Sequence, residues 1–105
     1  MVVNAKADDK ITFIAEIGLN HNGSIDLAKK HIEKAKESGA TVAKFQTYFA
    51  DSRAKKNSPI YDILKQCELN ETQFEELAEF CKNVGIAFAS TPFCEDSFHI
   101  LNKLN

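Results

Sequence analysis

The chain of 105 residues has few of the features that mark specialised protein classes. Four glycines and two prolines are too few for a disordered or fibrous protein, and 44% hydrophobic with 27% charged residues is typical of a globular domain. No apolar run approaches the ~20 residues of a membrane span, and the polar segment 1–6 does not resemble the start of a secretory signal. We therefore expect at most one domain, located in the cytoplasm.

An excess of charge of one sign is also absent. The chain has 13 basic and 15 acidic residues, which are interspersed and give a formal net charge of -2. A nucleic-acid-binding surface needs a basic stripe, and an anionic membrane attracts a basic face. The sequence therefore predicts neither nucleic acid nor a membrane as a partner.

The cysteines do not form a recognisable framework. Cys67, Cys81 and Cys94 are odd in number and lack C-x-x-C spacing, which argues against a disulfide scaffold and against a zinc knuckle. No pair of His, Asp, Glu or Cys has the spacing of metal ligands. We expect reduced, mostly buried thiols and no metal site within this chain.

What the chain does contain is an alternation of strand and helix patterns. Short apolar runs predict strands at residues 11–17, 41–47 and 86–90. Helical spacing and end signals predict four helices. They run from Ser24 to Gly39, over residues 60–67, from Asn70 or Thr72 to Gly85, and onward from Glu95 or Asp96.

Three local details follow from the same patterns. Thr72 and Glu75 have the spacing of a capping box at the start of the third helix. The polar segment 51–58, which includes Arg53, is expected to be a solvated loop, and the alternative is a segment that closes over a bound ligand. The last helix has an apolar stripe that begins at Phe98.

This order of elements predicts a fold class. Strand and helix alternate without hairpin signals, which is typical of right-handed βαβ units around a parallel sheet. A parallel sheet needs both faces covered, and three strands leave two free edges. The sequence therefore predicts an α/β piece of a larger fold, or one that is completed by assembly.

Polar side chains lie near the ends of the predicted strands, where packing alone would place apolar ones. If Phe13, Ala15 and Ile17 of the first strand face the helices, and Ala43 and Phe45 of the second do likewise, the polar side chains lie on the other face of the sheet. These are Glu16, Lys44 and Gln46, and Thr91 joins them from the third strand. The carboxyl ends of parallel strands are where α/β proteins bind ligands, and a lysine with an amide suits a carboxylate or a phosphate. The alternative is a structural ion pair of Glu16 with Lys44, while Gln46 and Thr91 bond to the backbone.

Residues 20–23 form a turn by composition, because Asn and Gly tolerate positive φ. In the functional interpretation, Asn20 and His21 lie at the mouth of the site, near the helix that starts at Ser24, and bind substrate hydroxyls or an anion. In the structural interpretation the segment is only a turn, and His21 bonds its neighbours. The sequence leaves both open.

Four segments together carry a family resemblance. In chain order they read AEIGLNHNGS, SGATVAKFQTY, CELN and GIAFASTPF. This ordered set resembles the N-terminal part of the sialic acid synthase family, whose members make sialic, legionaminic or pseudaminic acids or spore-coat polysaccharide precursors. The resemblance implies that residues 1–105 are the first three βα units of a truncated (β/α)8 TIM barrel, without a second domain. For the full-length enzyme it implies a homodimer, in which a small antifreeze-like domain reaches into the partner subunit.

The resemblance also implies a reaction. Phosphoenolpyruvate condenses with an N-acylated hexosamine to give a nine-carbon sugar acid and phosphate. Glu16 is then the catalytic residue at the amino sugar, Lys44 and Gln46 hold phosphoenolpyruvate, and Thr91 binds its phosphate or carboxylate. A divalent metal ion, Mn²⁺ or Mg²⁺, activates the sugar aldehyde, and its ligands lie beyond Asn105.

The chain departs from the family pattern in two respects. Asn22 stands where some members have an acidic residue, which leaves the choice of amino sugar open. The chain also stops before the metal-binding histidines, so we expect the fragment alone to be inactive. Two alternatives remain: another phosphoenolpyruvate-utilising or aldolase-type barrel, and a small complete βα module that binds or assembles without catalysis.

Overall fold

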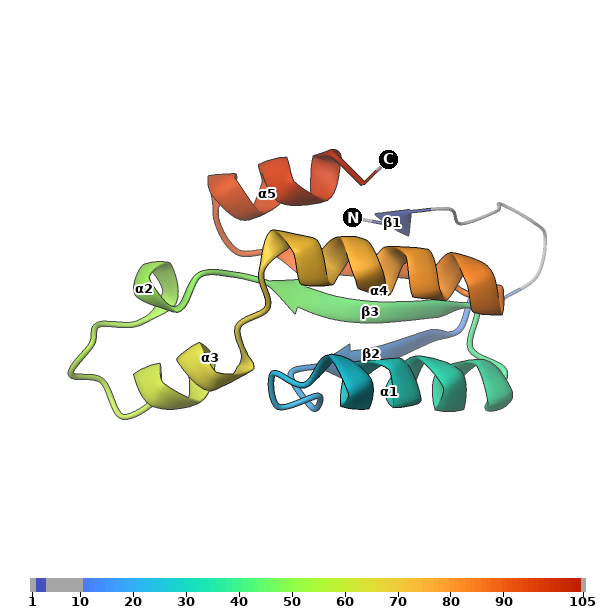
Figure 1. The fold of residues 1–105 in the computed structure, drawn as a ribbon, viewed down its shortest axis with the longest axis horizontal. Coiled ribbons are helices and arrows are strands. Elements are labelled where there is room, and N and C mark those ends of the chain that lie inside the picture. Colours follow the sequence, from blue (N-terminus) through green and yellow to red (C-terminus); the bar gives the residue numbers. More distant parts are fainter. Residues whose placement is uncertain (1, 4–10, 105) are drawn as a thin grey trace.

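The computed structural model describes residues 2–3 and 11–104 (Figure 1). Its centre is a four-stranded sheet in the order β1-β4-β3-β2. The strands are β1 (Val2–Val3), β2 (Ile14–Gly18), β3 (Val42–Thr47) and β4 (Ala87–Pro92). Strands β2, β3 and β4 run parallel, and β1 pairs with β4 in the antiparallel sense. The predicted α/β class with a parallel sheet is confirmed, and β1 is an element that the sequence pattern did not indicate.

Three helices pack on one face of the sheet and share one core with it. They are α1 (Ile25–Glu37), α4 (Glu71–Val84) and α5 (Glu95–Asn102). Two short helices, α2 (Ala50–Arg53) and α3 (Tyr61–Cys67), lie in the connection from β3 to α4. Figure 1 shows both beyond the arrowheads of β2 and β3, at the carboxyl ends of the strands. The prediction of a solvated loop over 51–58 was therefore wrong for its first residues, which belong to α2.

The core between the sheet and the helices is built around aromatic rings. Phe45 of β3 and Phe88 of β4 stack with their ring centroids 5.7 Å apart, and Phe74 of α4 meets Phe88 at 6.5 Å and 64°. Ile32 and Leu101 complete this layer, and these five side chains are at most 1% exposed. The helix-facing residues of each strand therefore make the core, and the alternate residues project from the other face.

The start of α4 corrects one prediction. Asn70 Oδ1 accepts a hydrogen bond from Gln73 N at 2.8 Å, and Gln73 Oε1 accepts one from Asn70 N at 2.9 Å. The capping box is therefore Asn70 with Gln73, and the predicted box of Thr72 with Glu75 was wrong, because Thr72 already lies inside the helix. The predicted end of this helix is confirmed at Gly85, which has a φ of 84°.

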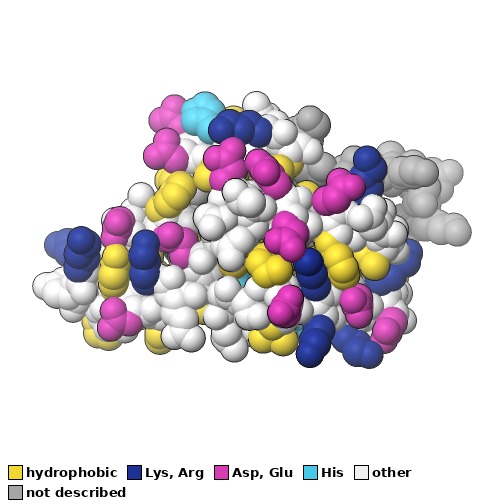
Figure 2. Space-filling model, in the orientation of Figure 1, with side chains coloured by type: hydrophobic (Ala, Val, Ile, Leu, Met, Phe, Trp, Pro, Cys, Tyr) yellow, Lys and Arg dark blue, Asp and Glu magenta, His cyan; other side chains and the backbone are white. Residues whose placement is uncertain are grey.

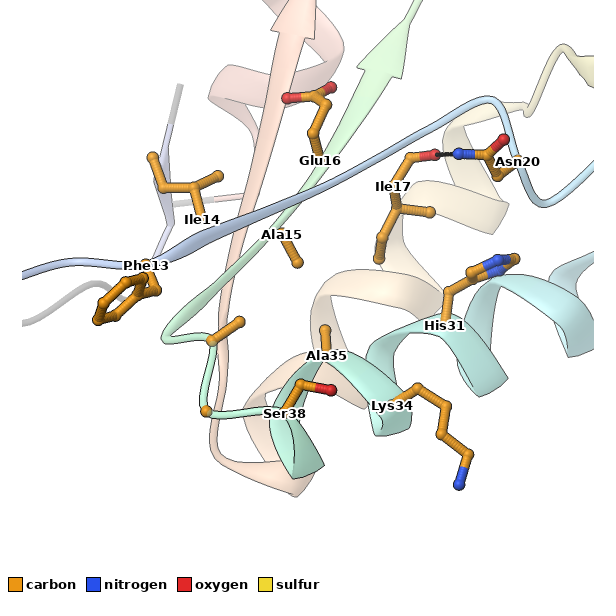
Figure 3. Close-up of a pocket in the computed structure, with 12 residues that line it drawn as sticks. Phe13, Ile14, Ala15, Glu16, Ile17, Asn20, His31, Lys34, Ala35 and Ser38 are labelled. Carbon is orange, nitrogen blue, oxygen red and sulfur yellow. Dashed lines mark hydrogen bonds between the residues drawn. The ribbon is translucent and has the colours of Figure 1, made fainter.

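The outer edge of β2 is apolar and open. The strand begins at Ile14 rather than at residue 11, and Ile11, Phe13 and Ile14 are 78%, 62% and 54% exposed. Phe13 therefore does not pack under the helices as predicted. Figure 3 shows it beside an open groove between β2 and α1, which Ala15 and Ala35 line deeper in. Beyond β3, β2 has no further pairing strand among the described residues, and exposed apolar residues on such an edge suit contact with another segment or chain.

The last strand and helix also differ from the prediction. β4 extends to Pro92 rather than ending at residue 90, because the backbone N–H of Phe93 donates to Thr47 O at 3.1 Å and continues the pairing past the proline. In α5, Leu101 is buried, but Phe98 is 47% exposed, because its side of the helix faces solvent.

The surface and the thiols agree with the composition. Figure 2 shows acidic and basic side chains interspersed over the face formed by α1 and α4, where Lys29 and Glu76 form an ion pair of 2.6 Å. All three cysteines are free, and Cys67 and Cys81 are buried. No helix among the described residues is long and apolar enough to span a membrane.

Candidate functional site

The carboxyl ends of the three parallel strands bring four of the predicted residues to one face. Glu16 on β2 is the register partner of Lys44 on β3, and Gln46 on β3 is the partner of Thr91 on β4. The intervening Phe45 belongs to the core beneath the helices, so these four side chains project from the opposite side of the sheet. We call Glu16, Lys44, Gln46 and Thr91 the strand-end face.

The end of β2 is irregular, and its last residue, Gly18, leaves a space without a side chain beside the strand-end face. Figure 3 shows Glu16 on one side of β2 and Ala15 and Ile17 on the other, toward α1. The register shifts between Glu16 and Gly18, and Gly18 has a φ of 60°. A Cβ at Gly18 would lie 3.7 Å from Gln46 Nε2 and 3.9 Å from Glu16 Oε1. The amide nitrogen and the carboxylate therefore flank one point in space, which the glycine leaves empty.

Glu16 and Lys44 form an ion pair in which Lys44 Nζ lies 3.1 Å from Glu16 Oε2. The Lys44 side chain is 36% exposed and that of Glu16 is 51% exposed. Ion pairs this open to water stabilise a fold by about 1 kcal/mol at most. The pair therefore contributes little to folding, but it places a cation and a carboxylate at a defined position beside the sheet end. Both interpretations of the sequence expected this contact, so only activity separates them.

Arg53 reaches this face from α2, a contact that the sequence did not predict. Its Nη1 donates to Gln46 Oε1 at 3.1 Å. The guanidinium carbon lies 4.0 Å from the ring centroid of Phe93 and 4.9 Å from that of Tyr48. One signal was available in the sequence: Tyr48 directly follows β3, and Phe93 directly follows β4. A cation is often held over such rings.

Asn20 lies at the end of β2. Its backbone N and its Nδ2 both donate to Ile17 O, at 3.1 and 3.0 Å, and Figure 3 shows the side-chain bond. The Asn20 side chain closes the strand end and remains exposed to solvent. Its predicted contact with substrate stays a prediction.

His21 does not join the strand-end face. Its side chain is fully buried, and its ring lies 6.1 Å from that of Phe45, in the core beneath the helices. Nδ1 accepts from Gly23 N at 2.9 Å, so the proton of the neutral ring is on Nε2, which has no hydrogen-bond partner among the described residues. Burial, and to a smaller extent His31, lowers the pKa of His21. The geometry matches the structural interpretation of this histidine, and its contact with substrate stays a prediction without support from its position.

The described residues do not form a metal centre. Over residues 11–104, no three His, Cys, Asp or Glu side chains gather in a way that could hold a metal ion. The groups available at the strand ends are one carboxylate, two cations, an amide and a hydroxyl. Together they can bind an anion and exchange a proton with a neighbouring oxygen.

This combination defines a class: an α/β protein with a parallel sheet and a group of polar side chains at the carboxyl ends of its strands, the place where such proteins bind ligands. The comparison with protein families identifies the member of that class. Residues 31–105 match the model of the NeuB family, and the chain belongs to this family.

Named relatives include sialic acid-type synthases. The chain is 41% identical to N,N'-diacetyllegionaminic acid synthase of Legionella pneumophila, over 87% of this chain and 30% of that protein. It is 34% identical to N-acetylneuraminate-9-phosphate synthase of Mus musculus, over 88% of this chain and 29% of that protein. The solved N-acetylneuraminic acid synthetase of Leptospira borgpetersenii superposes with a TM-score of 0.88 at 31% identity, over 92% of this chain and 34% of that one. The chain thus spans about a third of the length of these relatives.

Proposed function

We propose that this chain is the N-terminal part of a phosphoenolpyruvate-dependent synthase, and that it forms the first three βα units of a (β/α)8 barrel. The parallel strands follow chain order across the sheet, which is the arrangement of such a barrel. The similarity to about a third of the Leptospira synthetase and the open apolar edge of β2 support the same proposal.

In the proposed reaction, C3 of phosphoenolpyruvate attacks the aldehyde carbon of an N-acylated hexosamine and forms a carbon–carbon bond. Water then adds at C2, and phosphate leaves to give a nine-carbon sugar acid. One observation carries the assignment of residues: the Glu16–Lys44 pair of 3.1 Å lies on the same face as Gln46 and Thr91.

Each group on the strand-end face has a role in this proposal. Phosphoenolpyruvate carries a carboxylate and a phosphate, and the Lys44 ammonium, the Gln46 amide N–H and the Thr91 hydroxyl donate to their oxygens. Glu16 lies beside the sugar and exchanges a proton with the oxygen of its aldehyde. Ordered donors around a charged substrate stabilise charge that develops during reaction.

The proposed metal ion and the proposed homodimer concern the full-length protein. The residues described here do not gather a set of ligands for the proposed Mn²⁺ or Mg²⁺, so we assign the metal site to the remainder of the barrel and derive no step through it. We also propose a homodimer, which light scattering of the full-length protein in solution would detect.

Turnover by the full-length parent protein tests the proposal. The protein is given phosphoenolpyruvate, N-acetylmannosamine and Mn²⁺, and phosphate release is followed with the nine-carbon product by mass spectrometry. We expect phosphate only when both substrates are present. Other N-acylated hexosamines are tested in parallel. If none of them yields a nine-carbon acid, while phosphoenolpyruvate reacts with an unrelated aldehyde, the alternative aldolase-type barrel is correct.

A further inference from the structure

We propose that Arg53 is a positioning residue, which turns the Gln46 amide so that its N–H donors face the substrate side. This inference rests on the proposed function for its consequence, but not for its geometry. Arg53 Nη1 lies 3.1 Å from Gln46 Oε1. A guanidinium has only donors, so it can be paired only with the amide oxygen of Gln46, and this fixes which end of the amide is which.

The guanidinium of Arg53 is itself held in place by aromatic rings. It lies 4.0 Å from the ring centroid of Phe93 and 4.9 Å from that of Tyr48, and these two rings meet edge to face at 88°. Tyr48 is 2% exposed, and its hydroxyl donates to Leu64 O at 2.6 Å. The rings directly follow β3 and β4, so the position of the guanidinium is set by the sheet.

The helix that carries Arg53 is anchored at its other end. Ala50 N, at the start of α2, donates to Glu68 Oε1 at 2.7 Å. The one-turn helix α2 is thus bound to Glu68 at its first residue, Ala50, and its last residue, Arg53, packs on the two rings. These contacts hold Arg53 near the strand ends. Figure 1 shows α2 just beyond the arrowhead of β3, the strand that carries Gln46.

The consequence lies at the free end of the amide. Because Arg53 occupies Oε1, Gln46 Nε2 is directed toward the point beside Gly18, where Glu16 Oε1 also lies within 4 Å. The groups that Gln46 and Lys44 then offer to a ligand are donors only, which suits the anionic oxygens of phosphoenolpyruvate. Without Arg53 the amide can rotate and present its oxygen, which repels an anion.

Kinetics of the full-length protein test this role. In R53M, which keeps the apolar stem, we expect the KM for phosphoenolpyruvate to rise about tenfold, as for the loss of one charged hydrogen bond, with little change in the KM for the amino sugar. R53K keeps a donor and should recover part of the loss. K55M removes an exposed cation two residues away and should leave both constants unchanged. R53M combined with Q46A should be no worse than Q46A alone, because both act through one amide.

A second measurement separates this inference from the proposed function. Selective ¹⁵N labelling of glutamine gives the side-chain N–H₂ signals of Gln46, identified by their loss in Q46A. These signals should shift in R53M and stay in place in K55M, with no substrate present. Unmoved signals in R53M, or additive kinetic effects with Q46A, overturn the positioning role. Shifted signals in an enzyme that does not consume phosphoenolpyruvate would instead contradict only the proposed function.

Discussion

Gly23 is the position where the structure makes its sharpest stability prediction. Its φ is 81°, and a Cβ placed there would lie 2.0 Å from the backbone oxygen of Gln66 at the end of α3. The left-handed backbone alone costs a residue with a side chain about 1–2 kcal/mol. Moving a helix carbonyl away from the new methyl adds about 1–3 kcal/mol, as for overpacking elsewhere. We therefore expect G23A to destabilise the protein by about 3 kcal/mol.

Gly39 provides the matched control. Its φ is 93°, but nothing lies within 4 Å of a Cβ built there, so G39A introduces the backbone strain without the clash. At 2–4 °C per kcal/mol for a large domain, the thermal midpoint of the full-length protein should fall by about 6–12 °C in G23A. It should fall by only about 2–8 °C in G39A, where the backbone strain of about 1–2 kcal/mol acts alone. Differential scanning calorimetry measures both. Equal falls of the thermal midpoint in the two variants would refute the close contact between Gly23, in the turn of residues 20–23, and the backbone of Gln66 in α3.

Three further predictions concern single groups. The lowered pKa of His21 means that the folded state resists protonation, so the free energy of unfolding, relative to that of H21N, should fall as pH drops below 6.5. Above pH 6.5 the two proteins should depend on pH in the same way, as thermal midpoints from pH 5 to 8 would show. Burial raises the pKa of Cys81 to about 12, so a maleimide should label it far more slowly than Cys94 in peptide maps of the native protein. N70A should cost about 1 kcal/mol in denaturant unfolding, whereas T72A, inside the helix, should cost much less.

The sequence could predict the strand-end face because that prediction needs only the period of a strand. Alternation assigns Lys44 and Gln46 to one side of their strand as soon as Phe45 is assigned to the core, and it does the same for Glu16 once Ala15 and Ile17 are assigned there. The order of strands and helices then makes the sheet parallel, which brings the residues at the strand ends together. Neither step requires knowledge of distant contacts.

The features that the sequence analysis missed depend on such distant contacts. Arg53 looks like any residue of a polar loop until Glu68 anchors α2 and the ring of Phe93, forty residues away, lies under the guanidinium. The role of His21 was left open by the sequence, and its burial beside Phe45, which matches the structural interpretation, is visible only in the fold. Asn70 and Thr72 both begin plausible capping boxes, and the choice depends on where the incoming chain packs. In each case tertiary packing outweighs a local preference.

The Glu16–Lys44 pair allows the structural and the catalytic interpretations to be separated by one comparison. A purely structural pair of this exposure stabilises the fold by about 1 kcal/mol at most, so E16Q and K44M should lower the thermal midpoint of the full-length protein only slightly under either interpretation. If the pair serves the proposed reaction, E16Q should lower kcat and K44M should raise the KM for phosphoenolpyruvate. Each change should be well above tenfold, which is more than a free energy of about 1 kcal/mol corresponds to. K103M, which breaks the exposed 2.9 Å pair with Glu71, controls for loss of an ion pair as such and should leave turnover intact. Full activity in E16Q and K44M, with a stability loss like that of K103M, would mean that the pair is structural, because a catalytic role cannot leave the rate unchanged when its charge is removed.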